Sequence, residues 1–327
     1  MNVHRTLVAA ITLALMGTGL AQHHHFPEMK WKERQTDHFT IRTHDTRTDP
    51  AKRNAEDVWE ECQEILTGME DDFTKNKFRT PRGEKGSDEA PFRYTVYLLG
   101  TGYGYQTCLN TDKARYGWGD TQVRSLMMTG NYKDPLNRYI VICKVDPNES
   151  GGGGEQDKTS LFVHSSASSL LSGRARSSSL PFWMTAGWGY YIEHKITDGC
   201  RVLYLDFAEY YKNAKDTEIV KGGVLGPEDP WASPVKRLCR KDIRVSLEKV
   251  CNAKVITLSP NESGYIFALT YFLVSTDENR ASYRNLVKKA RDGDKITKEI
   301  LLMTYGYEDD EGFEKDWYEF VESSKFK

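Results

Sequence analysis

His164 and the serines that follow it are the residues of this chain whose types and spacing could carry chemistry. They lie in the stretch LFVHSSASSLL, residues 161–171. At 100° per residue on a helix, His164, Ser165 and Ser168 share one face with Leu161, and the opposite face is apolar. Side chains at i and i+4 on one face can hold a metal ion between them, or act as a base and a nucleophile. The spacing therefore raises two candidate chemistries, a metal site and a His164–Ser168 dyad.

The dyad is the weaker of these two hypotheses. A working dyad also needs a group that orients the base and donors that stabilise an oxyanion. In the middle of a helix the backbone N–H groups are already hydrogen-bonded within the helix. Serine hydroxyls at such positions commonly bond back to a carbonyl of the previous turn. We therefore interpret the serines as a polar helix face that looks away from the packed, apolar one.

A second helical segment, PFWMTAGWGYYIE, follows at residues 181–193. The order strand, helix, strand, strand, helix and the motifs L-F-V-H-x-x-A-x-x-L-L and Pro-x-Trp-x-x-x-Gly-x-x-x-Tyr resemble the gluzincin-type, peptidase MA-like zincin domains of exported bacterial proteins. The closing stretch TYGYEDDEGFEKDWYEFV is similar to their terminal helix, where acidic residues precede a tryptophan and an aromatic pair. The resemblance covers residues 33–323.

This resemblance implies a zinc site in which three of four functional positions have changed. In the family, the first helix carries His-Glu-x-x-His and the second carries a Glu just before a Gly. On this chain the first His matches His164, the general-base Glu falls on Ser165, the second His falls on Ser168, and the third ligand falls on Ala186. Serine is a poor zinc ligand beside imidazole or carboxylate, and alanine has no donor atom. Nor is Ser165 basic enough near neutral pH to take a proton from water.

We therefore expect His164, Ser165, Ser168 and Ala186 to be degenerate positions of a former metallopeptidase site. The chain is expected to hold no catalytic zinc, to need no other cofactor and to be no enzyme. Glu193 and His194, two turns beyond Ala186, are interpreted as surface charges at a helix end.

The amino-terminal residues have the features of a secretory signal peptide. A basic residue, Arg5, precedes an apolar run that ends with small residues at Gly19 and Ala21, and we expect residues 1–21 to be removed. No later segment is apolar enough to span a bilayer. We therefore expect a secreted or periplasmic, cell-envelope protein without a transmembrane anchor after cleavage.

The charge balance and the residues after the signal peptide limit the classes of partner that we expect. The chain has 45 basic and 47 acidic residues, so it lacks the basic field that holds a phosphate backbone, and nucleic acid is not an expected partner. Residues 22–37 are interpreted as a polar leader. If cleavage precedes Gln22, His24 becomes the third residue, a spacing that can bind Cu(II) or Ni(II), but a flexible leader is the favoured interpretation.

Six cysteines are present, and an even number in an exported chain predicts disulfides. They are Cys62, Cys108, Cys143, Cys200, Cys239 and Cys251. None forms a C-x-x-C pair, so a zinc cluster is not favoured. We expect at least one disulfide, with buried free thiols as the alternative.

Hydrophobic spacing predicts an α+β fold with two tightly packed parts. Strands are expected at residues 38–44, 92–100 and 138–145, with a helix that begins near Asp49 and covers the sheet. The glycine-rich GTGYGYQTC, residues 100–108, is interpreted as a turn-rich crossover or pocket rim, not as a phosphate-binding loop.

The expected fold class is a small mixed β-sheet with a covering helix, followed by a helical subdomain, gluzincin-like overall. The α/β part spans residues 38–150. After the glycine run at 151–154, residues 151–327 form the helical part that carries both motif helices. The former cleft should lie between these parts.

Three functions remain open from the sequence. The leading hypothesis is an exported pseudopeptidase that binds a peptide or protein in the remnant cleft. The alternatives are a structural or interaction protein of the cell envelope with a filled cleft, and a hydrolase that uses unidentified residues. An open cleft beside His164 would favour the first, plugging by Trp183 or Trp188 the second, and a perturbed titratable pair elsewhere the third.

Overall fold

The computed structural model describes residues 25–44, 49–69, 93–135, 139–143, 155–175, 180–200, 232–240, 245–254, 258 and 260–326. The expected signal peptide, His24 and the glycine run at 151–154 lie outside these residues. Residues Met1–Trp31 and Lys32–Lys327 form two separate compact units. In the described part of the first unit, the Trp31 indole donates to the Phe26 carbonyl over 2.9 Å.

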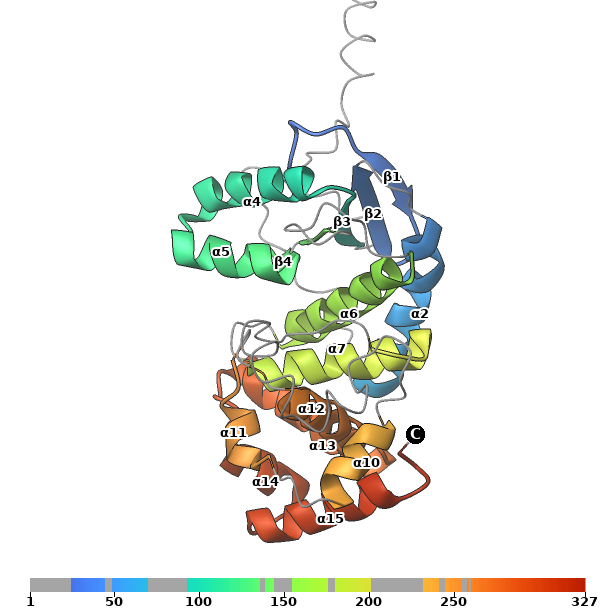
Figure 1. Cartoon of the computed structure of the whole chain (residues 1–327), viewed down its shortest axis with the longest axis vertical. Helices are drawn as coiled ribbons and strands as arrows, with labels where there is room; N and C mark the ends of the chain where they lie inside the picture. The colour runs from blue at the N-terminus through green and yellow to red at the C-terminus, as the bar shows by residue number, and fades with distance from the viewer. Residues whose placement is uncertain are drawn as a thin grey trace, which may run out of the picture. The chain divides into compact units, whose positions relative to one another are not determined.

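A five-stranded mixed sheet forms the core of the amino-terminal half of the second unit (Figure 1). Its strands are β1 (Lys32–Gln35), β2 (Phe39–His44), β3 (Tyr94–Leu99), β4 (Asn131–Lys133) and β5 (Tyr139–Cys143). They lie in the order β1-β2-β3-β5-β4, with β2, β3 and β5 parallel and the two outer strands antiparallel to their neighbours. The three predicted strands are confirmed as β2, β3 and β5.

β1 corrects the expectation of a polar leader, because it pairs with β2 inside residues 22–37. Its sequence, KERQ, has no apolar alternation and three of its four residues are exposed. The ladder with β2 and the ion pair of Glu33 with Arg42, at 2.9 Å, hold this edge strand in place, and its own sequence carried no strand signal.

Helices cover both faces of the sheet. One face presents apolar side chains that belong to the main core: Phe39, Ile41, Val96, Leu98, Ile140 and Ile142. This face is covered by α2 (Asp49–Leu66) and α6 (Glu155–Arg174). The predicted covering helix is confirmed as α2, which begins at Asp49 and buries Val58, Cys62 and Ile65.

The other face is covered by α4 (Gly102–Tyr116), which corrects the crossover expected at residues 100–108. The Thr101 hydroxyl oxygen accepts from the Gly104 N–H at the start of this helix, and Gly117 ends it at φ 67°. Buried Asp112 of α4 accepts hydrogen bonds of 2.8 Å from Tyr132 and Tyr139 and of 2.6 Å from Arg115. The sequence of α4 has no apolar stripe, which is why the helix was not predicted. Its caps and the hydrogen bonds of buried Asp112 stabilise it instead.

The remaining elements are helical, as predicted for residues 151–327, whereas the helix at residues 120–129 was not predicted. They are α5 (Asp120–Thr129), α7 (Phe182–Thr197), α10 (Ala232–Arg240), α11 (Leu247–Cys251), α12 (Pro260–Leu273), α13 (Asp277–Asp292), α14 (Lys298–Tyr305) and α15 (Asp310–Glu322). The fold class is therefore α+β, with the sheet confined to the first half. No helix in the described ranges is long and apolar enough to cross a membrane.

The expected disulfide is not formed in this structure. All six cysteines are free thiols, four of them buried and Cys239 and Cys251 half-buried. Burial raises the pKa of the Cys62 thiol to about 12. Buried free thiols, the alternative drawn from the sequence, describe what the structure contains.

Candidate functional site

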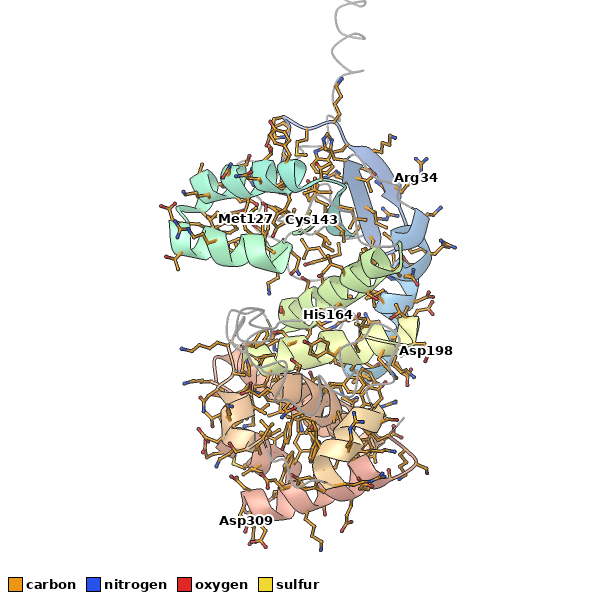
Figure 2. All side chains as sticks on the ribbon, viewed as in Figure 1. Arg34, Met127, Cys143, His164, Asp198 and Asp309 are labelled. Carbon is orange, nitrogen blue, oxygen red and sulfur yellow. The ribbon has the colours of Figure 1, made fainter. Side chains whose placement is uncertain are left out.

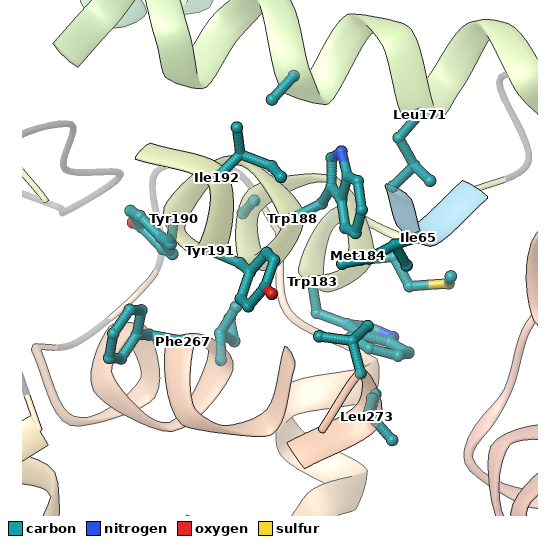
Figure 3. Close-up of a cluster of buried hydrophobic side chains, with 14 of the residues drawn as sticks. Ile65, Leu171, Trp183, Met184, Trp188, Tyr190, Tyr191, Ile192, Phe267 and Leu273 are labelled. Atoms are coloured by element: carbon teal, nitrogen blue, oxygen red, sulfur yellow. The ribbon is translucent and has the colours of Figure 1, made fainter. Parts of the chain in front are cut away.

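α6 and α7 bring the two sequence motifs together. They pack side by side, with the most extensive contact of any two helices described (Figure 1). α7 begins after Pro181, whose fixed φ suits a helix start, and ends at Asp198 in the left-handed conformation with φ 57°. α7 is buried on all sides, and Figure 3 shows its aromatic side chains among residues of α2, α6 and α12.

His164, labelled in Figure 2, forms a buried pair with Glu193 at the α6–α7 interface. The imidazole Nδ1 lies 3.0 Å from Oε2 of Glu193, and neither side chain has any exposed surface. Tyr190 packs its ring edge-to-face on the imidazole, with centroids 5.0 Å apart. Because a carboxylate oxygen accepts, Nδ1–H is the donor of this bond.

Nε2 of His164 faces Gly189 and Ser168. A Cβ atom on Gly189 would lie 2.5 Å from Nε2 and 2.6 Å from the Ser168 hydroxyl oxygen, so only a glycine fits at this point. The Ser168 hydroxyl donates to the Thr185 carbonyl over 2.9 Å, which fixes α6 against the turn of α7 before Gly189. Glycine at this position is therefore what allows the two helices to approach so closely.

The structure places the four degenerate positions around this contact in different ways. His164 and Ser168 are brought together at Gly189. Ser165 lies next to His164 on α6 and is 5% exposed, and Ala186 is buried on α7 one turn before Gly189. The Ser168 hydroxyl is already bonded to α7, so the structure supports no role for it as a nucleophile activated by His164.

These residues do not fit a zinc ion. His164 offers one imidazole, Ser168 and Ser165 offer hydroxyls, and Ala186 offers nothing. In the described ranges, no three His, Cys, Asp or Glu side chains gather closely enough to hold a metal. The carboxylate of Glu193 is bonded to Nδ1 of His164.

The sequence interpretation missed that Glu193 is the buried partner of His164. The expectation that it is a surface charge is wrong, because its side chain is completely buried. It lies seven residues, two helical turns, after Ala186, on the same face of α7. That spacing was the available signal, but an isolated Glu near a helix end is normally exposed, so only the packing of α6 could reveal its partner.

The serine face of α6 is also a correction. Ser165 is 5% exposed and the Ser168 hydroxyl is bonded to the Thr185 carbonyl of α7, so the polar face does not look away from the core as expected. The sheet, α2 and α7 surround this helix, and small serine side chains let them approach it closely.

The space around His164, where the sequence led us to expect a cleft, is closed. The imidazole has no exposed surface, and Trp183 and Trp188 are equally buried. Trp188 does not plug the site, since its ring stacks on Tyr191 and Tyr283 at centroid distances of 5.9 and 5.5 Å. The close approach of α7 at Gly189, and not a tryptophan, fills the space in front of Nε2.

His194, the neighbour of Glu193, forms a half-buried pair with Tyr271 of α12. Nδ1 of His194 lies 2.5 Å from the Tyr271 hydroxyl. Burial lowers the pKa of His194, although Asp198 opposes the shift, and burial raises the pKa of Tyr271. Both groups are thus held in their neutral forms, and the pair ties α7 to α12.

This pair predicts a pH dependence of stability. The folded pKa of His194 lies below its unfolded value of about 6.5, so the unfolded state binds the proton more tightly. Its contribution is complete above pH 6.5 and is lost as the pH falls towards the folded pKa. Compared with His194→Gln, the wild type should lose up to about 1.4 kcal/mol more per pH unit. Urea unfolding between pH 7.5 and 5 tests this; equal slopes for both proteins would contradict it.

One recess of about 540 Å³ lies away from His164. It is lined by the start of α7 (Leu180, Pro181), by α11 and by the turn into α14. Its Lys298 is already bonded to Asp310 over 2.8 Å and lies 3.6 Å from Glu248. Because His164, Ser168 and Glu193 are not among its lining residues, the recess is separate from the α6–α7 site. The ammonium of Lys298 is paired with carboxylates of the chain.

Comparison with known proteins assigns no family to this arrangement. No family model matches the chain, and a search of curated proteins found no match to it.

Proposed function

We propose that this chain is a catalytically inactive, metallopeptidase-like protein whose former site helices now have a structural role, and that it acts by binding other molecules. The observation that carries this proposal is the buried His164–Glu193 pair. A metal-ligating histidine usually donates its second ring N–H to a carboxylate, which fixes the ring for the metal. His164 keeps such a carboxylate, whereas the positions expected to supply further ligands are Ser168 and Ala186. This combination is what loss of the ligands from a gluzincin-like fold would leave.

Inactivity follows from the residues present. With one imidazole there is no ligand set for zinc, and with serine at position 165 there is no base for the attacking water. His164 is itself bonded to Glu193 and covered at Gly189. No substrate carbonyl could reach it without separation of α6 from α7.

The burial of His164 favours a structural or interaction protein over a pseudopeptidase that binds peptides in its remnant cleft. A peptide-binding cleft would leave the old ligand positions in contact with solvent, yet His164 and Ala186 are at most 1% exposed and Ser168 is half-buried. A partner would therefore meet the chain elsewhere on its surface. We expect this to happen outside the cytoplasm, because residues 1–21 have the features of a signal peptide.

The hydrolase alternative gains little from the His194–Tyr271 pair. Burial is the largest cause of both pKa shifts, and the rings pack among Phe267 and Phe326. A pair whose titration is shifted mainly by burial between helices is typical of packing, whereas catalytic pairs combine burial with a specific charge partner in a cleft.

Restoring the ligands tests the relation to gluzincins. The variant Ser165→Glu/Ser168→His/Ala186→Glu should bind zinc, more weakly than a natural site because the surrounding packing has changed. The wild type should bind no stoichiometric zinc and, with zinc added, should cleave no peptide in a mixed library. Calorimetry with zinc measures the first and mass spectrometry of the library the second.

The matched control adds His164→Leu to the triple variant, which should abolish the gained binding. A folded triple variant that binds no more zinc than the wild type would refute the proposed correspondence of positions. Peptide cleavage by the wild type that is lost in His164→Leu would refute inactivity.

A further inference from the structure

The recess between the start of α7, α11 and the turn into α14 is a preformed cavity. Its volume of about 540 Å³ lies within the range of about 300–1,000 Å³ that is typical of small-molecule sites. Its walls are helix ends that the chain itself fixes. The Ser246 hydroxyl oxygen caps the start of α11, the Thr297 hydroxyl oxygen caps the start of α14, and α13 ends at Gly293 with φ 105°. The cavity therefore does not have to form when a ligand binds.

Part of the lining is apolar. Leu180 and Pro181, which precede α7, are half-buried, and Ile296 is 2% exposed. The half-buried Cys251 at the end of α11 also lines the recess. A ligand with an apolar body would remove this surface and its own from water, which favours binding.

The rim of the recess carries charges of both signs. Lys298 is engaged within the chain, because its ammonium is bonded to Asp310 over 2.8 Å and lies 3.6 Å from Glu248. Lys295 and Glu299 are exposed at the rim, and in the part of the chain that the structure describes no ion pair involves either of them. A ligand with one charge would be attracted by one of these side chains and repelled by the other. A ligand that carries both charges can place each one against its opposite.

We propose that this recess binds a short zwitterionic peptide of dipeptide size with apolar side chains. The carboxylate of the peptide pairs with Lys295, its ammonium pairs with Glu299, and its side chains cover the apolar part of the lining. Each pair at an exposed rim contributes at most about fivefold in affinity, so recognition needs both charges and the apolar body. This inference rests on the binding role proposed above, for which it names a site and a ligand class, and not on the correspondence with gluzincins.

Protection of a cysteine shows whether the peptide occupies the recess. The full chain is alkylated with N-ethylmaleimide in the presence and absence of leucyl-leucine, and the modified thiols are quantified by peptide mapping. Cys239 on α10 is the internal control, because it is half-buried like Cys251 but does not line the recess. Burial raises the pKa of both thiols to about 12, so a change in one rate reports access and not acidity. Saturating leucyl-leucine should slow the alkylation of Cys251 several-fold and leave Cys239 unchanged.

Blocking one end of the peptide tests the two charges. N-acetyl-leucyl-leucine keeps only the carboxylate and leucyl-leucine amide keeps only the ammonium, and calorimetry should show that each binds roughly two- to fivefold more weakly than leucyl-leucine. Lys295→Glu should reverse the preference, so that the amide binds more tightly than leucyl-leucine. Lys288→Glu is the matched control, since it reverses the charge of an exposed lysine on α13 that does not line the recess, and it should leave both affinities unchanged.

Equal rates of Cys251 alkylation with and without leucyl-leucine would overturn the inference. It would also be overturned if Cys239 were protected equally, or if Lys295→Glu and Lys288→Glu had the same affinities for both peptides. The proposed loss of activity is decided separately, by zinc binding and peptide cleavage, so failure at the recess leaves that result unaffected.

Discussion

Replacing His164 with leucine is expected to lower the free energy of unfolding by about 3–5 kcal/mol. The change removes the imidazole that is bonded to Glu193, whose side chain has no exposed surface, and removal of one member of a buried pair is strongly destabilising. Loss of the imidazole volume adds less, because leucine fills most of the same space. Urea denaturation at pH 7 measures the effect.

The double variant His164→Leu/Glu193→Met is the decisive control. Replacing both members of a buried pair by apolar residues of similar volume is often neutral or stabilising, so the double variant should be more stable than His164→Leu alone. Glu193→Met alone should cost about 1–3 kcal/mol, since it removes the carboxylate that is bonded to Nδ1 of the buried imidazole. Additive costs in the double variant would show that the two side chains are not coupled, and the structural role proposed for the pair would fail.

Gly189→Ala is expected to lower the free energy of unfolding by about 1–3 kcal/mol. Alanine is the better helix former by about 0.5–1 kcal/mol, but its Cβ would lie 2.5 Å from Nε2 and 2.6 Å from Cε1 of His164. The hydrogen bond to Glu193 holds that ring in place, and the added Cβ would also lie 2.6 Å from the Ser168 hydroxyl oxygen. Overpacking therefore outweighs the gain in helix propensity.

Gly312→Ala in α15 is the matched control for this prediction. The added Cβ would meet nothing closer than 3.4 Å, so the same substitution should be neutral or stabilise by up to about 1 kcal/mol. If Gly189→Ala and Gly312→Ala both have the free energy of unfolding of the wild type, α6 and α7 do not approach each other closely at Gly189.

Local sequence signals determined the elements whose residues carry their own reason to form. β2, β3 and β5 were predicted from apolar and β-branched runs, and α2 from its periodic stripe after Asp49 and Pro50. The helix of His164 and the helix of Ala186 were predicted too, as α6 and α7. These features depend on residues within a few positions of one another, which is why the sequence alone was sufficient.

The features that the sequence did not predict depend on parts of the fold that are distant along the chain. β1 is a strand because β2 pairs with it. α4 is a helix because Thr101 and Gly117 cap it and because Asp112 finds two tyrosines from other strands. The cysteines do not pair, although their even number suggested it, because the fold keeps them apart as free thiols. No spacing along the chain encodes such distances.

The candidate site also has features that the sequence determined and features that only the tertiary structure decided. From the sequence alone it followed that one imidazole, His164, remains where the resemblance implies three ligands, because ligand identity is a property of single residues. Only the tertiary structure decided that Glu193 is its partner and that the space before Nε2 is filled. Burial of a carboxylate is unfavourable for the residue alone, and it occurs here because Gly189 lets α7 approach α6 until the imidazole N–H takes the place of water.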